Sequence, residues 1–281
     1  MTDRKLKNTK IFNDTMAQVF SNSTLRQAVT DSTENQIFIS EKSKIRVPAP
    51  TKTTKATVVV SGKRSLEASE SYAKQGKKVC VLNFASSTTP GGGVLYGSSA
   101  QEESICRCST LYPCLNTDEM QDLFYDPHYE AHNPIGNADC IYTPNVCVLK
   151  SDTDFPESLP EKDWWKVDII TCAAPDLRHR PSNAMNPLDG DAAVQISTQD
   201  FEKLIAQRIR RIFEIAAAEK NDVLILGAFG CGAFKNPPQI VAKVFYDIMQ
   251  DFLCHFDVIE YAVFHMSHES INYETFCNAM L

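Results

Sequence analysis

The stretch KKVCVLNFASSTTPGGGVLYGSSAQEE, residues 77–103, is the most informative part of this chain about its architecture. Its apolar run, residues 78–84, predicts a buried strand, and three consecutive glycines follow at 91–93. Gln101-Glu102-Glu103 then opens a segment with helical spacing that we extend to residue 115. A strand, a glycine-rich turn and a helix in this order are typical of α/β proteins, whose ligands bind at the carboxyl ends of strands.

A second glycine-rich loop, GAFGCGAF at residues 227–234, follows the apolar strand predicted at 223–226. Glycine permits positive φ angles and close approach of a ligand, and successive backbone N–H groups can converge on phosphate. One such loop alone is more simply a tight turn, but two at equivalent strand ends favour a diphosphate site. Neither loop is a dinucleotide fingerprint or a P-loop, because Asn236 stands where a third glycine is needed and no G-K-[ST] follows.

Alternating strands and helices continue from residue 56 to the end of the chain. Hydrophobic periodicity predicts further strands at 57–60, 140–149, 167–174 and 258–266, and further helices at 66–75, 201–216 and 241–253. This pattern predicts one mostly parallel, three-layer α/β domain over residues 51–281. Residues 1–50, with one helical face and short extended pieces at 36–39 and 44–47, are predicted to be an accessory helical segment.

Composition limits the possible functions. A net charge of −7 over 281 residues argues against general nucleic-acid binding, so no direct DNA partner is expected. No apolar run is long enough to span a bilayer and no signal peptide is recognisable, so a cytoplasmic location without membrane partners is expected. The ten cysteines include no C-x-x-C pair, which favours reduced thiols, and neither a metal nor a cofactor is expected.

Glu102 and Glu103 at the start of the predicted helix allow two interpretations. The first is structural: negatively charged side chains near the N-terminus of a helix stabilise it through the helix dipole. The functional one is that one carboxyl group faces a ligand while the other supports it, because adjacent helical residues point about a quarter-turn apart. A single glutamate acting as an acid is therefore favoured over a pair of equivalent carboxylates. The helix end lowers the pKa of such an acid and burial raises it, and the sequence does not say which prevails.

Several other side chains are better explained without chemistry. Cys231 could be a nucleophile, but no partner histidine is evident, so it is predicted to be a small loop residue. His128 and His132 lie in a segment predicted to be a surface loop, with a spacing to Cys140 that fits no common metal site. Trp164 and Trp165 are predicted to pack, and residues 176–198 to form a long loop that rims the site or is mobile.

These motifs resemble the bacterial-type poly(ADP-ribose) glycohydrolase family of macrodomains. The family signature is three glycines, a short spacer and Q-E-E, and here seven residues separate Gly93 from Gln101. The flanking stretches VLNFAS at 81–86 and STLY at 109–112 are also similar to the family, as is the second loop. Ala233 and Lys235 are small departures from the second-loop pattern.

The resemblance implies a macrodomain-like α/β/α sandwich with a mixed, mostly parallel sheet and an N-terminal helical extension. It implies that ADP-ribose lies across the strand ends with its diphosphate between the loops. Glu103 would be the catalytic acid, Glu102 would hold the substrate ribose, and Phe234 would orient the distal ribose. The implied ligand-binding residues are Asn83, Gly91, Gly92, Gly93, Val94, Gln101, Gly230, Cys231, Gly232, Ala233 and Phe234.

The implied reaction is hydrolysis of the ribose–ribose O-glycosidic bond of poly(ADP-ribose), which releases ADP-ribose. The expected partners are ADP-ribose, the polymer and ADP-ribosylated proteins. Three alternatives stay open: a module that binds ADP-ribose without cleaving it, a hydrolase of another conjugate such as mono-ADP-ribosyl protein or O-acetyl-ADP-ribose, and a nucleotide-binding regulatory protein. Tyr273 and Phe276 lie where macrodomains often stack adenine, although core packing explains them equally well.

Overall fold

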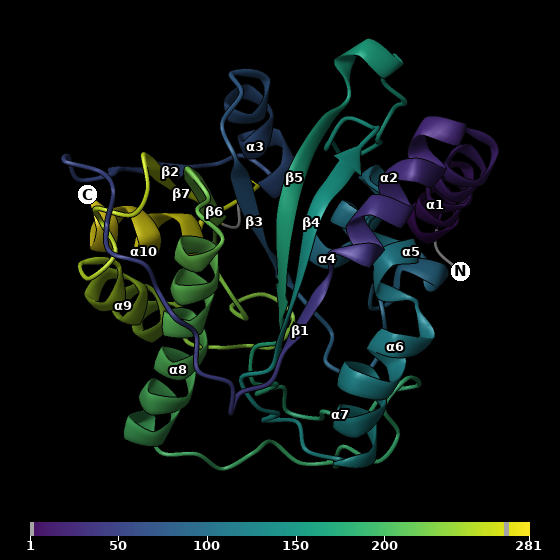
Figure 1. Cartoon of the computed structure of the whole chain (residues 1–281). Coiled ribbons are helices and arrows are strands. Elements are labelled where there is room, and N and C mark those ends of the chain that lie inside the picture. The colour runs from purple at the N-terminus through teal and green to yellow at the C-terminus, as the bar shows by residue number, and fades with distance from the viewer. Residues whose placement is uncertain (1–2, 267–269) are drawn as a thin grey trace.

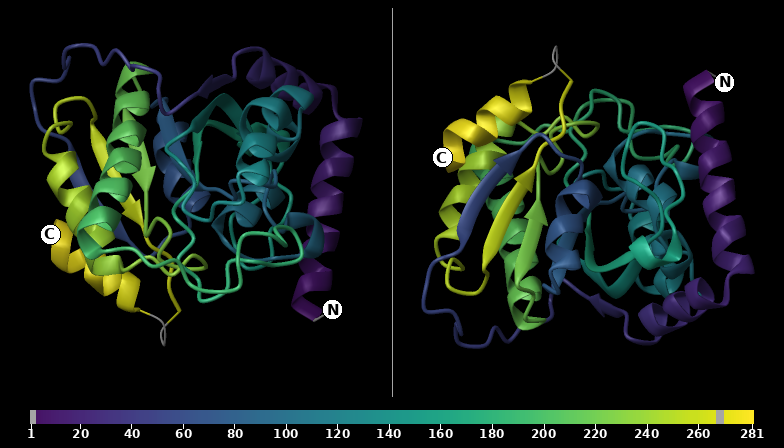
Figure 2. Two further views of the ribbon diagram at one scale, coloured as in Figure 1. Left: turned by 90° about the horizontal axis from the view of Figure 1, so that it is seen from below. Right: turned by 90° about the horizontal axis from the view of Figure 1, so that it is seen from above.

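A computed structural model of the chain, in which residues 3–266 and 270–281 are described, contains one mixed sheet between two layers of helices (Figures 1 and 2). The strands are β1 (Ile37–Ile39), β2 (Thr57–Ser61), β3 (Val79–Phe84), β4 (Cys140–Val148), β5 (Trp165–Cys172), β6 (Val223–Leu226) and β7 (Val258–Ala262). The longer helices are α1 (Asp3–Ser21), α2 (Ser23–Glu34), α3 (Ser65–Lys74), α4 (Gln101–Cys108), α8 (Thr198–Ala218), α9 (Pro238–Met249) and α10 (Ile271–Met280). Shorter helical pieces are η1 (Val94–Tyr96), α5 (Leu111–Leu115), α6 (Asp118–Met120), η2 (Gln121–Tyr125), α7 (Asp126–Glu130) and η3 (Glu161–Asp163).

The seven strands are ordered β1-β4-β5-β3-β6-β7-β2. The five strands from β5 to β2 are parallel, while β4 runs antiparallel to both β5 and β1. The parallel strands end at the lower edge of the sheet in the view of Figure 1. Since β3 and β6 are hydrogen-bonded neighbours, the two glycine-rich loops that follow them leave the sheet side by side.

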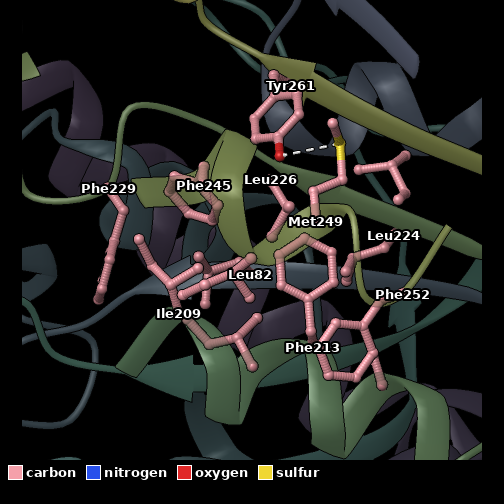
Figure 3. Packing of buried hydrophobic residues seen from close by; sticks show 14 of the residues in the cluster. Leu82, Ile209, Phe213, Leu224, Leu226, Phe229, Phe245, Met249, Phe252 and Tyr261 are labelled. Carbon is pink, nitrogen blue, oxygen red and sulfur yellow. Dashed lines mark hydrogen bonds between the residues drawn. The ribbon is translucent and has the colours of Figure 1, made fainter. Parts of the chain in front are cut away.

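Successive residues of each strand point to opposite faces, so one apolar strand supplies two cores. In β3, Cys80 and Leu82 join a core that α8, α9 and α10 cover, whereas Val79 and Val81 join a core under α1, α3 and α4. Figure 3 shows the aromatic part of the first core, where the rings of Phe213 and Phe252 stack 5.3 Å apart. Two covered faces explain why the strands read as almost continuous apolar runs.

The predicted strands and long helices are confirmed, with two differences in extent. The helix predicted over residues 101–115 breaks after Cys108, because Ser109 pairs with Val148 and the Thr110 N–H donates to the Cys147 carbonyl oxygen at 2.9 Å. The strand predicted over 258–266 ends at residue 262, where its neighbour β2 also ends. In both places the neighbouring strand sets the boundary, and local periodicity does not contain that information.

The segment predicted to be a surface loop around His128 is helical from Asp118 to Glu130. His128 is buried, and its two ring nitrogens lie 2.6 Å from the Phe124 carbonyl oxygen and 2.8 Å from Asn137 Oδ1. The surface-loop prediction was therefore wrong for His128, because these contacts stabilise the helix around it, whereas His132 lies in an exposed turn as expected. In residues 3–266 and 270–281, no group of three or more His, Cys, Asp or Glu side chains could hold a metal ion.

The N-terminal helices pack directly on the sheet and on α4. The Thr15 hydroxyl donates to the Arg107 carbonyl oxygen at 2.6 Å, and the buried Lys150 ammonium donates to the Ile11 carbonyl oxygen at 3.0 Å and to Asp14 at 2.6 Å. The predicted extended piece at 36–39 is confirmed as β1, whereas residues 44–47 form no strand. The domain boundary at residue 50 stays a prediction. Within the described residues, no helix is long and apolar enough to cross a bilayer.

Candidate active site

The two glycine-rich loops and the start of α4 meet at the carboxyl ends of β3 and β6. Gly91 and Gly92 have φ angles of 67° and 56°, a conformation that favours glycine. A Cβ atom on Gly92 would lie 2.8 Å from Glu103 Oε1 and 3.0 Å from Glu102 Oε2. The first loop therefore passes so close to both carboxyl groups that no side chain fits between them.

Glu103 lies in the first turn of α4 and is 7% exposed. Its Oε1 accepts a hydrogen bond from the Gly93 N–H at 2.9 Å. Its other carboxylate oxygen, Oε2, is buried and has no hydrogen-bond partner in the described part of the chain. Since buried polar atoms are normally paired, this oxygen is a candidate for a contact with a substrate.

Glu102 has a different environment, in which both oxygens are occupied. Its Oε2 accepts from the Ser86 N–H at 2.7 Å, and its Oε1 accepts from Asn83 Nδ2 at 3.2 Å. Burial, followed by the nearby charge of Glu103, raises the pKa of Glu102 to about 8. The raised pKa favours the protonated form of Glu102, which reduces electrostatic repulsion between the two adjacent carboxyl groups.

The raised pKa of Glu102 predicts a pH dependence of stability. The unfolded chain releases this proton near pH 4.5 and the folded chain near pH 8, so only the folded state holds it in between. The free energy of unfolding should therefore fall as pH rises from 5 to 8, by up to about 1.4 kcal/mol per pH unit from this group. Glu102→Gln should flatten that slope, as measured by urea unfolding at several pH values. An unchanged slope in the variant would rule out Glu102 as its source.

The backbone N–H groups of the first loop are already engaged by the protein. Those of Gly92 and Val94 donate to the carbonyl oxygens of Thr89 and Gly91, at 2.9 and 3.1 Å. The backbone of Gly91 hydrogen bonds to Glu102, and Gly93 donates to Glu103. This loop therefore holds the two carboxyl groups in place.

The second loop is different, because it leaves several backbone N–H groups without an acceptor. Among the residues that the structure describes, no acceptor lies in range of the N–H groups of Gly230, Gly232, Ala233 and Phe234. Gly230 has a φ of 74°, and a Cβ there would lie 2.6 Å from Ala174 Cβ. Several unpaired N–H groups close to a left-handed residue form the kind of arrangement that binds phosphate.

Two predicted ligand contacts have protein partners, although the buried Oδ1 of Asn83 has none among the described residues. The Gln101 side chain donates to the Leu82 carbonyl oxygen at 2.7 Å and accepts from the Phe84 N–H at 2.9 Å, which ties α4 to the end of β3. Asn83 is fully buried and donates to Glu102 and to Thr171 Oγ1. Direct contact of either residue with a ligand stays a prediction, and their visible role is to hold α4 and Glu102.

Other predicted site residues divide into core and loop positions. The Val94 side chain is fully buried in the core under α1, α3 and α4. Burial raises the pKa of the Cys231 thiol to about 12, which agrees with the prediction that it is no nucleophile. Phe276 is fully buried, while the ring of Tyr273 stacks on His265 at 4.5 Å. Trp165 is buried and donates to Ser69 Oγ, as expected of a packing residue.

The loop between β5 and α8 connects the two glycine-rich loops. The Leu177 N–H donates to the Phe234 carbonyl oxygen at 2.9 Å, and the Arg178 guanidinium lies 5.7 Å from the Phe234 ring centre. Further along, the Thr88 hydroxyl donates to Asn186 Oδ1 at 2.5 Å. Figure 2 shows this loop crossing the lower side of the molecule, so it forms the predicted rim.

Three residues of the site have roles that the sequence does not indicate. The Ser86 N–H binds Glu102 through its backbone, which no side-chain motif reveals. Arg107 is buried within α4, where its guanidinium donates to the Ser98 carbonyl oxygen at 2.5 Å and its positive charge lies near Glu103. Asn236 fixes the second loop by donating to the Pro175 carbonyl oxygen at 2.7 Å. In the sequence, these residues are marked only by their proximity to the two glycine-rich loops and to Gln101-Glu102-Glu103.

Comparisons with known proteins agree with this architecture. The poly(ADP-ribose) glycohydrolase of Thermomonospora curvata has 24% identity and a TM-score of 0.83, with 97% of this chain and 99% of that chain covered. The same enzyme bound to the inhibitor ADP-HPD has 22% identity, a TM-score of 0.79 and coverage of 96% and 98%. The glycohydrolase of Deinococcus radiodurans in complex with ADP-ribose has 23% identity, a TM-score of 0.73 and coverage of 89% and 96%.

These structural similarities confirm the predicted macrodomain-like fold. No curated relative was found by sequence. The family model described as "Microbial-type PARG, catalytic domain" matches residues 6–151, just over half of the chain. That range includes most of α1, the first glycine-rich loop and both glutamates, so the resemblance seen in the sequence is confirmed. The chain belongs to the microbial-type poly(ADP-ribose) glycohydrolase (PARG) catalytic domain family.

Proposed function

We propose that this protein hydrolyses the ribose–ribose O-glycosidic bond of poly(ADP-ribose), with Glu103 as the acid and base. The observation that carries the proposal is the Glu103 carboxyl group, of which one oxygen is fixed by the Gly93 N–H and the other is buried without a partner among the described residues. Family membership supplies the substrate class. A cytoplasmic location is part of the proposal as well.

The unpaired N–H groups of Gly230, Gly232, Ala233 and Phe234 would bind the diphosphate of one ADP-ribose unit. Gly232 supports this role, because it is exposed and a Cβ there would meet no protein atom within 4 Å. The fold itself therefore does not require glycine at this position. A phosphate that approaches the backbone closely does require it.

The diphosphate, once fixed, sets the position of the ribose that reacts. Glu103 Oε2 donates its proton to the glycosidic oxygen as the C–O bond breaks, which leaves an oxocarbenium-like ribose and a free hydroxyl on the departing chain. The resulting carboxylate takes a proton from water as the water oxygen bonds to the anomeric carbon. The products are ADP-ribose and a polymer that is one unit shorter.

Glu102 has a supporting role in this proposal. Its two oxygens are held by Ser86 and Asn83, so it is not placed to act as a second nucleophile or acid without losing these bonds. Burial and the charge of Glu103 raise its pKa, so it adds little negative charge beside the reacting acid. In the proposed mechanism, Glu103 alone donates a proton and then accepts one.

Incubation of the wild-type protein with automodified polymerase and, separately, with mono-ADP-ribosylated protein tests the function. We expect free ADP-ribose, identified by mass, from the polymer. Release from mono-ADP-ribosylated protein alone would favour the alternative hydrolase. Tight binding of ADP-ribose without any product would favour a binding module, which needs no unpartnered acid at its site.

A further inference from the structure

The first turns of α1 carry a concentrated positive charge. Within residues 3–10 there are one acidic residue, Asp3, and four basic residues, which we call the α1 basic segment: Arg4, Lys5, Lys7 and Lys10. All four basic residues are exposed. Residues 3–10 therefore have a net charge of +3 in a chain whose net charge is −7, which makes this stretch a local attractor for anions.

The α1 basic segment lies against the chain that follows the first glycine-rich loop. Asn8, buried on α1, donates from Nδ2 to the Gly97 carbonyl oxygen at 3.0 Å. Gly97 has a φ of 73°, and a Cβ there would collide with the Lys5 carbonyl oxygen. The backbone of α1 thus touches the chain four residues after Gly93, which anchors Glu103.

Between Gly93 and Gly97 the chain exposes two large apolar side chains to solvent. Leu95 is 49% exposed and Tyr96 is 60% exposed, although both lie in the short helix η1 and not at a loop tip. The Tyr96 N–H donates to the Gly93 carbonyl oxygen at 3.0 Å, so the ring is carried by the same backbone that holds the acid. An exposed aromatic ring on an ordered turn is the kind of platform on which nucleic-acid bases stack.

We propose that Tyr96 and the α1 basic segment bind the portion of the polymer that lies beyond the scissile bond. The adenine of the adjoining unit stacks on Tyr96, and the pyrophosphates that follow lie along Lys7 and Lys10. This proposal rests on the proposed function, because it assumes that Glu103 faces the glycosidic bond. Binding at this surface makes the protein prefer long polymer chains to short ones.

Neighbouring acids weaken the segment only slightly. Arg4 pairs with Asp154 at 3.2 Å and Lys7 pairs with Asp3 at 2.9 Å, and both pairs are solvent-exposed. Exposed ion pairs contribute little free energy, so a pyrophosphate can replace these partners. The net negative charge of the whole chain does not attract a polyanion, so binding near the site depends on local positive charge such as that of the α1 basic segment.

The test compares Tyr96→Ala and the double variant Lys7→Gln/Lys10→Gln with the wild type. For long polymer we expect the KM to rise in both variants with kcat unchanged, by about tenfold in Tyr96→Ala because removal of one stacked base has an effect of that order. The Kd for free ADP-ribose should stay within about twofold of the wild-type value, a difference well below 1.4 kcal/mol. The double variant should also reduce the salt dependence of polymer binding, by about 0.7 in the log–log slope for each lysine–phosphate pair that it removes.

Matched controls lie on α8 and α9, which cover the opposite face of the sheet. Lys203→Gln/Lys243→Gln removes the same charge from exposed, paired lysines, and Tyr246→Ala removes a 43% exposed ring. Equal effects in controls and test variants, or an equal loss of ADP-ribose affinity, would overturn the proposal. Labelled polymer binding to Glu103→Ala needs no turnover, so it tests the surface even if the wild type cleaves no polymer.

Discussion

Glu103→Ala is expected to reduce the release of ADP-ribose from poly(ADP-ribose) by about a thousandfold or more, the range that a general acid contributes. The same variant should bind free ADP-ribose within about tenfold of the wild type, or roughly 1.4 kcal/mol. The reason is that the proposed diphosphate contacts come from backbone N–H groups of the second loop, which this side chain does not touch. The measurements are product formation by mass and ADP-ribose affinity by calorimetry.

Two further variants test whether the loss of activity comes from the loss of the Glu103 proton. Glu103→Gln keeps the shape and can still accept from the Gly93 N–H, yet it cannot donate a mobile proton, so it should be as inactive as the alanine variant. Glu260→Gln changes another buried glutamate, which hydrogen bonds to Ser61 and Tyr72, and it should retain activity. Wild-type rates in Glu103→Gln would remove Glu103 from the chemistry.

Gly92→Val should abolish turnover and lower the free energy of unfolding by about 2 kcal/mol, because a β-branched residue in the left-handed region is strained by about 1–2 kcal/mol. The φ angle of Gly92 is 56°. The added Cβ would also lie 2.8 Å from Glu103 Oε1 and 3.0 Å from Glu102 Oε2. Both carboxyl groups must then move, and the anomeric carbon loses its acid.

Gly76→Val is the matched control for this effect. Gly76 has a φ of 80°, also in the left-handed region, but a Cβ there would meet no atom within 4 Å. The control should share the loss of stability and keep its activity, which separates backbone strain from displacement of the acids. Thermal unfolding and ADP-ribose release are the measurements, and an active Gly92→Val would contradict the site geometry.

The two glycine-rich loops have different roles in the structure. The sequence suggests two equivalent loops that share a diphosphate, whereas the structure shows two kinds of loop. The first directs the N–H groups of Gly91 and Gly93 at the carboxyl groups, and the second leaves four of its N–H groups, from Gly230 and residues 232–234, unpaired among the described residues. We therefore expect substitutions in the first loop to affect turnover more than ADP-ribose affinity, and those in the second to affect affinity.

The fold class could be predicted because its signals are local. Apolar strands with both faces buried, amphipathic helices such as α8, and glycines at 91 and 92 that have positive φ are each properties of a few neighbouring residues. The missed helical stretch at 118–130 shows the limit of such signals. Its buried His128 is hydrogen-bonded to Phe124 and Asn137, and a histidine in the sequence carries no local sign that it will be buried in this way.

Most strands and long helices, the two loops and the acid pair after the first loop are determined by local sequence. Three other features depend on the packing of the layers: the pairing of β3 with β6, the support of Gly97 by Asn8 of α1, and the unpartnered oxygen of Glu103. The physical reason is distance along the chain. A hydrogen bond between residues 89 positions apart forms only when whole layers come together, and neither residue carries a local sign of its partner.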